Sequence, residues 1–313
     1  MARRVLVAGE TLVDFLPDKP GSLAAVDSFS RQAGGAPANV AVGLARLEQT
    51  PWFCTTLAGD SFGEYLAGVL NREGIPDRFV SREPTTQTAL AFVSHNQDAD
   101  REFTFYRKGT ADRQFDTSII PDTTLKSVDI VVIGGVTLTV EPARSATFDL
   151  VERAQNMDCQ VLFDPNVRDE LWEVDAERTM QRMLSLTDVL KCSQDDLGGR
   201  ALTAEVHELL DSGPEVLFMT KGDDGASLIA DTASLWGHGT WHHDGYQVDD
   251  VADTTGAGDA FTAGVVTGLL DKGAPEDILG FANAVAAAST RSEGAMTALP
   301  DREATRRVRV GDC

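Results

Sequence analysis

The segment from Asp253 to Phe261, DTTGAGDAF, places a carboxylate behind a loop that is almost free of side chains. The apolar run FTAGVVTGLL that follows predicts a helix beginning near residue 260. Backbone N–H groups at a helix start bind anions such as phosphate, and small residues let a phosphate come close. The residues of this predicted anion loop are Gly256, Ala257 and Gly258.

The aspartate of this segment, Asp259, would lie at the rim of the anion site. There it could take a proton from an alcohol while the loop amides stabilise the transferring phosphoryl group. The segment therefore indicates phosphoryl transfer to a hydroxyl group. An aspartate that caps a helix after a glycine-rich turn has the same spacing, so the segment alone leaves both interpretations open.

A second turn of small residues opens another predicted helix in AGGAPANVAVGLARL. Gly34 and Gly35 would admit a sugar ring, and Asn39 can hydrogen-bond a polyol. Taken alone, this motif favours an ordinary helix start with proline in its first turn. Its significance depends on the other motifs.

Two kinds of element alternate along the chain and would position these turns. Continuous apolar runs that end in Gly, Asp, Asn or Ser predict strands buried on both faces, in RRVLVAG, WFCTTLAG, DIVVIGG, QVLFDPN, DVLKCS and VLFMTKG. Helical spacing of apolar residues predicts helices in PANVAVGLARLE, SFGEYLAGVLNREG, EPARSATFDLVERAQNM and AERTMQRMLSLT. The alternation predicts an α/β fold with a mostly parallel sheet, whose ligands bind at the carboxyl ends of the strands.

Two segments, near residues 11–35 and 88–112, interrupt this alternation. In the second, AFVSH and REFTFYR alternate around a polar turn and predict a β-hairpin. Both segments would suit a small antiparallel β-sheet that serves as a lid. The sequence shows no internal repeat and no flexible linker, so we expect residues 1–313 to form a single domain.

The charge of the chain excludes some partners. Its formal net charge is −22, and only six of its cationic residues are lysines. Such a field repels nucleic acid and destabilises the compact state unless salt screens it. We therefore expect a salt-adapted, halophilic host; an acidic protein of ordinary origin is the alternative.

The amino terminus and the cysteines predict a cytoplasmic protein. The opening MARRVLVAGE has an apolar run too short for a signal peptide or a membrane span. Four scattered cysteines lack the spacing of a zinc site, and we expect reduced thiols. The histidine-rich segment WGHGTWHHDGYQVDDV predicts a β-hairpin with surface histidines rather than a metal site.

Seven motifs in order resemble those of the PfkB/ribokinase family of sugar kinases over nearly the full chain. They are Asp14 after a strand, the turn at Gly34, Gly35 and Asn39, DPNVR at Asp164 to Arg168, KCSQDD at Lys191 to Asp196, TKGDDG at Thr220 to Gly225, DTTGAGDAF, and Asn283 with Gly294. GETLVDFLP, TALAFV, REFTFYRKGTAD and DPNVRDELW are similar to fructokinase segments. The resemblance implies a ribokinase-like three-layer α/β/α sandwich and an ATP-dependent kinase for fructose, with O6 favoured.

The resemblance also implies roles for single residues. Asp259 would be the base, and Arg168 would bridge the transferring phosphate oxygens; an ion pair with Asp169 or Glu170 is the structural alternative. The sugar-binding residues would be Asp14, Gly34, Gly35, Asn39, Tyr106 and Arg107. The nucleotide-binding residues would be Ser193, Thr220, Gly222, Gly225 and Asn283, of which the last could instead be a helix-surface amide.

Two cations are implied as well. Magnesium would accompany ATP, ordered through water by Asp196, where fructokinases commonly carry glutamate. A monovalent cation, potassium in most relatives, would lie beside the anion loop near Asp253 and Thr255.

Three other functions and one assembly stay open. A 2-keto-3-deoxygluconate kinase shares several motifs, and its acidic substrate would need partners such as Tyr106, Arg107 and Lys108. A non-catalytic sugar-binding regulatory protein could have the same fold, and a nucleoside kinase is disfavoured by the fructokinase-like lid. The lid could also pair two copies of the chain into a homodimer.

Overall fold

The computed structural model describes residues 4–95, 101–197, 199, 202 and 206–311. Within these residues the main sheet has nine strands, in the order β13-β12-β11-β10-β9-β8-β1-β4-β5. Their bounds are β1 Val5–Ala8, β4 Trp52–Ala58, β5 Val80–Glu83, β8 Ile130–Gly134, β9 Gln160–Asp164, β10 Val189–Ser193, β11 Val216–Thr220, β12 Ala226–Ala230 and β13 Gly239–His243. Neighbours from β11 to β5 are parallel, whereas β12 and β13 are antiparallel. All six predicted strands lie in this sheet.

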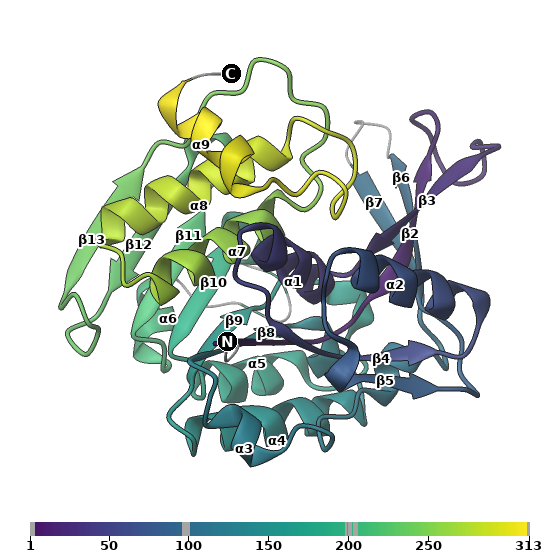
Figure 1. Cartoon of the computed structure of the whole chain (residues 1–313), viewed down its shortest axis with the longest axis horizontal. Helices are drawn as coiled ribbons and strands as arrows, with labels where there is room; N and C mark the ends of the chain where they lie inside the picture. Colours follow the sequence, from purple (N-terminus) through teal and green to yellow (C-terminus); the bar gives the residue numbers. More distant parts are fainter. Residues whose placement is uncertain (1–3, 96–100, 198, 200–201, 203–205, 312–313) are drawn as a thin grey trace.

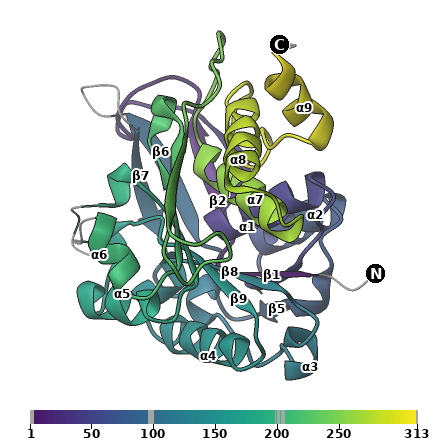
Figure 2. The same cartoon turned by 90° about the vertical axis from the view of Figure 1, so that its left-hand side faces the viewer.

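Helices cover both faces of the sheet (Figures 1 and 2). One face carries α1 Ala36–Arg46, α2 Ser61–Arg72, α7 Ala257–Leu270, α8 Pro275–Ser289 and α9 Arg302–Val310. The other carries α3 Asp122–Leu125, α4 Ala143–Gln155, α5 Ala176–Leu184 and α6 Val206–Asp211. Alternate residues of β1 belong to the two cores, since Val5 and Val7 pack on the first side and Leu6 and Ala8 on the second. The predicted ribokinase-like three-layer α/β/α fold is confirmed.

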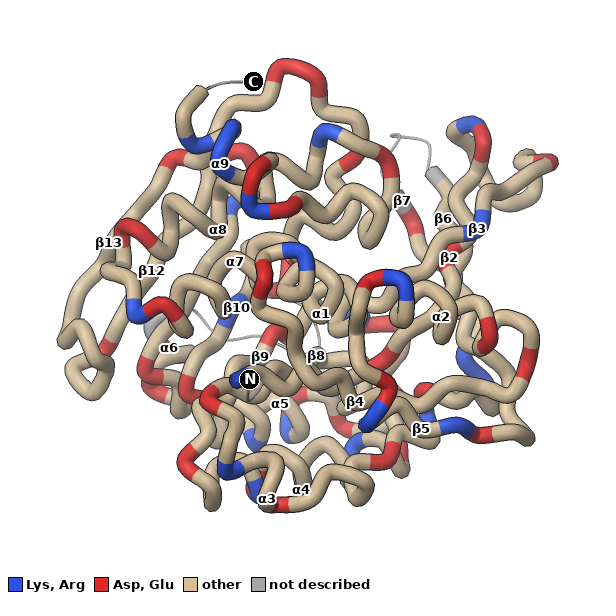
Figure 3. Tube along the Cα trace, viewed as in Figure 1, with Lys and Arg blue, Asp and Glu red and all other residues tan. Residues whose placement is uncertain are grey.

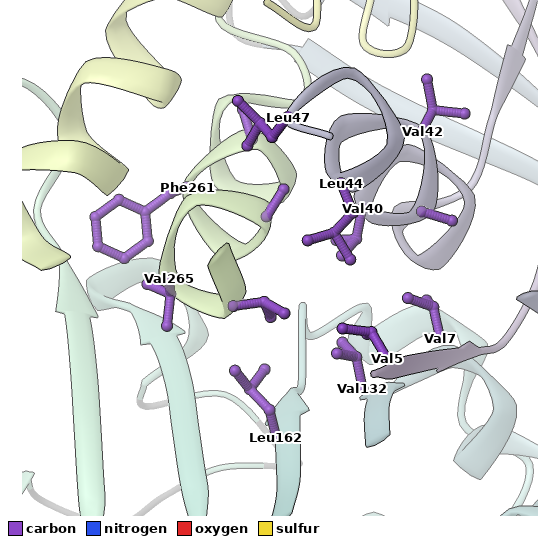
Figure 4. Close-up of a cluster of buried hydrophobic side chains, with 14 of the residues drawn as sticks. Val5, Val7, Val40, Val42, Leu44, Leu47, Val132, Leu162, Phe261 and Val265 are labelled. Carbon is purple, nitrogen blue, oxygen red and sulfur yellow. The ribbon is translucent and has the colours of Figure 1, made fainter. Parts of the chain in front are cut away.

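The close contact between α1 and α7 brings two distant motifs together. A Cβ atom on Gly43 of α1 would lie 2.9 Å from the Cβ of Ala263 in α7, so the helices approach with almost no side chain between them. Leu44 packs in the same core as Phe261 and Val265 (Figure 4). This packing joins the starts of the two helices, where both predicted ligand-binding turns lie.

A second sheet of four strands forms the lid, in the order β3-β2-β6-β7. Its strands are β2 Leu12–Pro17, β3 Phe29–Gly34, β6 Leu90–His95 and β7 Arg101–Tyr106. The predicted hairpin is confirmed as β6 and β7, and its turn, 96–100, lies outside the described residues. One face of the lid packs Leu12 and Ala91 against Phe103 and Phe105.

Three expectations about local structure were wrong. The lid sheet is not wholly antiparallel, because its middle strands β2 and β6 run parallel. The helix after the glycine loop begins at Ala257 rather than near residue 260, so most of the loop is already the first turn of α7. The segment from Trp236 to Val251 is not a hairpin in itself. It contains one strand, β13, which pairs with the preceding strand β12. The strand ends at His243, and an irregular stretch then leads to the anion loop.

Candidate active site

A cavity of about 640 Å³ lies at the carboxyl ends of the central strands and reaches the inner face of the lid. At the strand ends it is lined by Glu10, Val136, Arg168, Ser193 and Thr220, and from the lid by Leu12, Asp14, Phe103 and Phe105. Predicted site residues that line it further include Gly35, Asn39, Arg107, Asp196, Gly222, Gly225, Thr255, Gly256, Ala257, Gly258, Asp259 and Asn283. The cavity therefore gathers most of the motifs, whereas Gly34, Tyr106 and Asp253 are not among its lining residues.

The anion loop has the backbone conformation that its glycines predict. Gly256 is the N-cap of α7 and has a φ of 81°, in the left-handed region. A Cβ atom there would lie 2.8 Å from the Cα of Ala295. The amide of Ala257 donates to the carbonyl of Thr254 over 3.2 Å, which closes the turn. The next amides, of Gly258 and Asp259, are in the first turn of the helix and have no intrahelical acceptor, so they can bind an anion.

Asp259 is buried and is held by Asn39. The amide nitrogen Nδ2 of Asn39 donates to Oδ2 of Asp259 over 2.7 Å. Burial raises the pKa of Asp259 to about 7, although the Asn39 hydrogen bond opposes this shift. A carboxyl with a pKa near neutrality is suited to accept a proton from an alcohol. The contact also links the motif predicted to bind the sugar to the motif predicted to bind phosphate.

Asp14 and Gly34 lie next to each other on the neighbouring strands β2 and β3 of the lid. A Cβ atom at residue 34 would lie 1.9 Å from Oδ2 of Asp14, so only glycine leaves room for this carboxylate. Burial and the negative charge of Asp259 raise the pKa of Asp14 to about 7, while the charge of Arg168 lowers it. Gly34 therefore leaves the space that the Asp14 carboxylate occupies.

Arg168 places its charge near both carboxylates. Its guanidinium donates to the carbonyl of Val167 over 2.8 Å and lies 5.7 Å from the ring centre of Phe103. Its positive charge lowers the pKa values of Asp14 and Asp259. An arginine in this place can neutralise an anionic group that enters the cavity.

Tyr106 and Arg107 occupy opposite faces of the hairpin. Arg107 is buried and forms an ion pair with Asp112, with 2.5 Å between Nη2 and Oδ2. Tyr106 is 58% exposed, and its ring lies 5.6 Å from that of Phe92 on the outer face of the lid. Lys108 is exposed as well. The structure does not bring these three residues together as one cluster.

The nucleotide-side residues lie at the ends of β10 and β11 and on α8. The hydroxyl of Thr220 is 3.5 Å from the carbonyl of Cys192. Gly222 and Gly225 have positive φ angles, and a Cβ on Gly225 would lie 2.0 Å from the carbonyl oxygen of His243. Asn283 is buried and lines the cavity, so the alternative of a helix-surface amide is wrong.

Asp196 organises the strand ends rather than presenting a bare carboxylate. Its Oδ1 accepts from the amide of Val167 over 2.7 Å. Its Oδ2 accepts from the amide and the hydroxyl of Ser193 over 2.8 and 2.7 Å. Within the described ranges, no group of three or more His, Cys, Asp or Glu side chains could hold a metal directly. This arrangement fits a magnesium ion that the triphosphate carries and that Asp196 contacts through water.

Asp253 fastens the anion loop to the segment after α8. Its carboxylate accepts from the amide of Thr255 over 2.7 Å and from the amide of Gly294 over 2.9 Å. Its own amide donates to the carbonyl of Thr290 over 3.2 Å. The two loops are thereby joined where main-chain oxygens could bind a monovalent cation.

Residue-by-residue inference missed a buried polar cluster under the anion loop. Nζ of Lys191 lies 3.1 Å from Oδ2 of Asp164, which also accepts a 2.8 Å hydrogen bond from the hydroxyl of Thr262. A Cβ on Gly258 would be 3.2 Å from Nζ of Lys191. A lysine inside the apolar strand DVLKCS was the signal, because a buried lysine needs a partner.

A second missed residue is Glu10, which directly follows the first strand and Gly9. It is only 3% exposed, and it lines the cavity. Nothing in its local pattern predicted burial, because it stands where the chain leaves the sheet for the lid.

Throughout the part of the chain that the structure describes, no helix is long and apolar enough to cross a membrane.

Comparisons with known proteins agree with this geometry. Residues 2–302 match the pfkB family carbohydrate kinases. The probable fructokinase-6, chloroplastic, of Arabidopsis thaliana is 34% identical over 317 residues, covering 96% of this chain and 80% of that protein. The crystal structure of fructokinase with bound ATP from Xylella fastidiosa has a TM-score of 0.86 at 30% identity, covering 100% of this chain and 99% of that one.

A further structure holds the other ligands that the motifs imply. It is a double mutant of the Vibrio cholerae O395 fructokinase in a form with fructose, ADP and potassium ion bound, with a TM-score of 0.82 at 29% identity and 98% coverage of both chains. The family match over residues 2–302 and the structural similarity cover the same part of the chain, which includes every motif described above. The chain therefore belongs to the pfkB family of carbohydrate kinases.

Proposed function

We propose that the protein transfers the γ-phosphoryl group of ATP to O6 of fructose. The observation that carries this proposal is the position of Asp259, a buried carboxyl with a pKa of about 7 at the first turn of α7. It is bound to the sugar-side residue Asn39 and directly follows the anion loop. Base and phosphate site therefore share one cavity, as phosphoryl transfer to an alcohol requires.

The residues of the cavity would divide the reaction between them. Asp259 would accept the proton of the sugar hydroxyl, whose oxygen forms a bond to the γ-phosphorus as the bond to the oxygen of the leaving ADP breaks. The amides at the start of α7 and the guanidinium of Arg168 would stabilise the negative charge on the transferring group. Magnesium, bound with ATP, would neutralise the triphosphate charge, and Asp196 would contact it through water.

The sugar would lie between the lid and the start of α1. Asp14, Asn39 and the backbone at Gly35 would bind its hydroxyl groups, and the rings of Phe103 and Phe105 would cover the cavity from the lid. A covered site keeps water from accepting the phosphoryl group. The nucleotide would extend toward Ser193, Gly225 and Asn283.

The hairpin supports fructose over 2-keto-3-deoxygluconate. A carboxylate on the substrate would need a free cation or a tyrosine hydroxyl. The charge of Arg107 is already balanced by Asp112, and the side chain of Tyr106 lies on the outer face of the lid. A neutral sugar needs neither group. The Arabidopsis relative and the Xylella and Vibrio structures reported above all carry the name fructokinase, in agreement with this preference.

Three broader proposals accompany this activity. Potassium would bind beside the anion loop near Asp253 and Thr255, as the bound ion of the Vibrio cholerae structure suggests. The protein would work as a homodimer through the lid. The protein would be located in the potassium-rich cytoplasm of a salt-adapted host, in keeping with its net charge of −22.

The test is ADP release in high KCl with magnesium and ATP, compared across fructose, 2-keto-3-deoxygluconate, glucose, ribose and adenosine. Fructose should lead, and the product should be converted by phosphoglucose isomerase, which requires the 6-phosphate. Asp259→Asn is the control. A higher rate with 2-keto-3-deoxygluconate would overturn the choice of sugar, and a product that the isomerase ignores would overturn O6. Failure with every acceptor would favour the non-catalytic sugar-binding protein.

A further inference from the structure

Glu10 lies deep in the cavity, beside the turn that opens α1. It follows β1 and Gly9, and its side chain is 3% exposed. A Cβ on Gly35 would lie 2.8 Å from the main-chain oxygen of Glu10, so the two backbones are in close contact. A Cβ on Gly134, at the end of β8, would lie 4.0 Å from its Oε2. Glu10 therefore lies at the sugar end of the cavity.

One oxygen of this carboxyl lacks a hydrogen bond. Within the described part of the chain, Oε2 of Glu10 has no partner, and neither has Oδ1 of Asn39. Both atoms are buried, and both residues line the same cavity. Buried polar atoms in proteins are nearly always bonded, so two unbonded oxygens on residues that line one cavity point to a ligand that supplies the donors.

The charges around Glu10 do not provide a structural reason for an acid there. The pKa of Glu10 is raised to about 7, mainly by burial and less by the charges of Asp112 and Asp259, while a backbone hydrogen bond and the charge of Arg107 oppose the shift. Among the described residues, Arg107 is ion-paired with Asp112 and forms no hydrogen bond to Glu10. An amide or an apolar side chain would be easier to bury in this place.

We propose that Glu10 is a sugar-binding residue, whose Oε2 bonds a hydroxyl group of the acceptor other than the one that is phosphorylated. This inference rests on the proposed function and deepens it. A polyol presents several hydroxyl groups, each able to donate or accept, so either protonation state of Glu10 can bond one. Asp259 serves the reacting hydroxyl, and Glu10 fixes the orientation of the ring.

Two substitutions separate sugar contact from structural support. Glu10→Gln keeps the shape and a polar end, while Glu10→Ala removes both. We expect Glu10→Ala to raise the KM for fructose about 10- to 100-fold and to leave the KM for ATP within about twofold, because the contact is to the sugar alone. Glu10→Gln should fall between Glu10→Ala and the wild type. The control is Asp188→Asn, which also replaces a carboxylate by an amide. Asp188 accepts a hydrogen bond from the amide of Val161, and its replacement should leave the KM values for fructose and for ATP unchanged.

Deoxy sugars identify the bonded hydroxyl. The wild type and Glu10→Ala are compared on fructose, its 1-, 3- and 4-deoxy analogues, and 2,5-anhydromannitol, which lacks the anomeric hydroxyl. For one analogue, the substitution should lower kcat/KM by little or nothing, because the partner hydroxyl is already missing. An equal loss on every sugar would mean that Glu10 shapes the cavity without bonding the sugar, and an unchanged KM for fructose would also overturn the proposal.

Calorimetry without ATP distinguishes failure of this inference from failure of the proposed function. If the wild type binds fructose without phosphorylating it, the proposed reaction is wrong, and weaker binding by Glu10→Gln still supports the contact. If the wild type does not bind fructose, both proposals are overturned. Circular dichroism checks that each variant is folded, and Glu10→Gln carries the test if Glu10→Ala does not fold.

Discussion

At the residue scale, the cavity holds three acidic residues whose pKa values are raised by their surroundings. Burial is the leading cause that raises the pKa values of Glu10, Asp14 and Asp259 to about 7 each. The negative charge of Asp259 also raises the pKa values of Glu10 and Asp14. Such shifts gather at functional sites, where a proton must move near neutral pH.

Replacement of the base should remove most of the turnover without removing the fold. Asp259→Asn keeps the size of the side chain next to Asn39 but cannot accept the proton, and we expect kcat to fall by about 10²- to 10⁴-fold. In the wild type, kcat/KM for the sugar should fall as the pH drops below about 7, because the base becomes protonated. A pH–rate profile measures both effects. A wild-type profile that is flat from pH 5.5 to 8 would contradict the assignment.

The raised pKa of Glu10 predicts a stability effect of definite sign. Its pKa rises from 4.5 to about 7 on folding, so its protonated form is favoured in the folded state. The contribution of this group to stability is greatest below pH 4.5 and is lost as the pH rises through 7, on the order of 3 kcal/mol in all. Glu10→Gln cannot ionise, so its melting temperature should gain on the wild type between pH 5 and pH 8. A constant difference between the two proteins across that range would contradict the shift.

At the element scale, the anion loop depends on two glycines for different reasons. Gly256 needs its left-handed φ of 81°, and its added Cβ would meet the backbone of Ala295. Gly258 has no such φ, and its added Cβ would lie 3.2 Å from Nζ of Lys191, which is buried and ion-paired with Asp164. The first glycine therefore shapes the turn, and the second keeps space above a buried cation.

Matched alanine substitutions should separate these roles. Gly256→Ala should lower the free energy of unfolding by about 1–3 kcal/mol, because the backbone must move. Gly258→Ala should change it by less than about 1 kcal/mol but lower kcat/KM for ATP about tenfold or more, because its methyl group would crowd Lys191 under the anion loop and displace the loop amides. Thermal unfolding and ATP kinetics measure the pair. Equal losses of stability in the two variants would contradict the distinction.

Sequence patterns predicted the elements better than the contacts between them. The apolar runs and glycine turns identify the parallel strands and the ligand-binding helix starts, because both signals are local. The pairing of Lys191 with Asp164 arises from the adjacency of β9 and β10, and the pairing of Arg107 with Asp112 depends on the path of the lid. The hairpin expected after Trp236 was wrong because turn residues do not specify which strand pairs with β13. In the structure that strand is β12, which precedes it.

At the scale of the whole molecule, the outer face of the lid is aromatic, and its Phe15 end packs edge to face on Phe62 of α2. The rings of Phe15 and Phe92 stack with 4.7 Å between centres, Phe29 meets Phe92 edge to face, and Tyr106 completes the group at 58% exposed. β3 and β7 form the two edges of this sheet. An apolar face beside open edges favours pairing with a second copy.

The dimer should depend on this face. In sedimentation velocity at 1 M KCl, the wild type should have twice the mass of the chain, and Tyr106→Glu should have the mass of one chain, because it adds a charge to the apolar contact. Leu235→Glu is the matched control, since Leu235 is 92% exposed in the connection between β12 and β13 and should leave the dimer intact. A wild type that sediments as a single chain would remove the proposed dimer.

The net charge of −22 makes salt part of the stability of the molecule. Acidic residues are spread over the surface loops and helices (Figure 3), so their repulsion acts across the whole molecule rather than at one site. Raising the ionic strength from 0.1 to 1 M shortens the screening length from about 10 to about 3 Å and should raise the melting temperature by several degrees.

The choice of salt separates this repulsion from a specific cation site. NaCl and KCl at equal ionic strength should raise the melting temperature alike, because screening does not depend on which monovalent cation is present. Catalytic rate should respond differently if a site near Asp253 and Thr255 selects potassium, with kcat higher in KCl at every concentration. Equal rates in the two salts would leave the charge effect intact and remove the potassium site. A melting temperature that is independent of both salts would instead show that the surface charge does not limit stability, and the expectation of a salt-adapted host would fail with it.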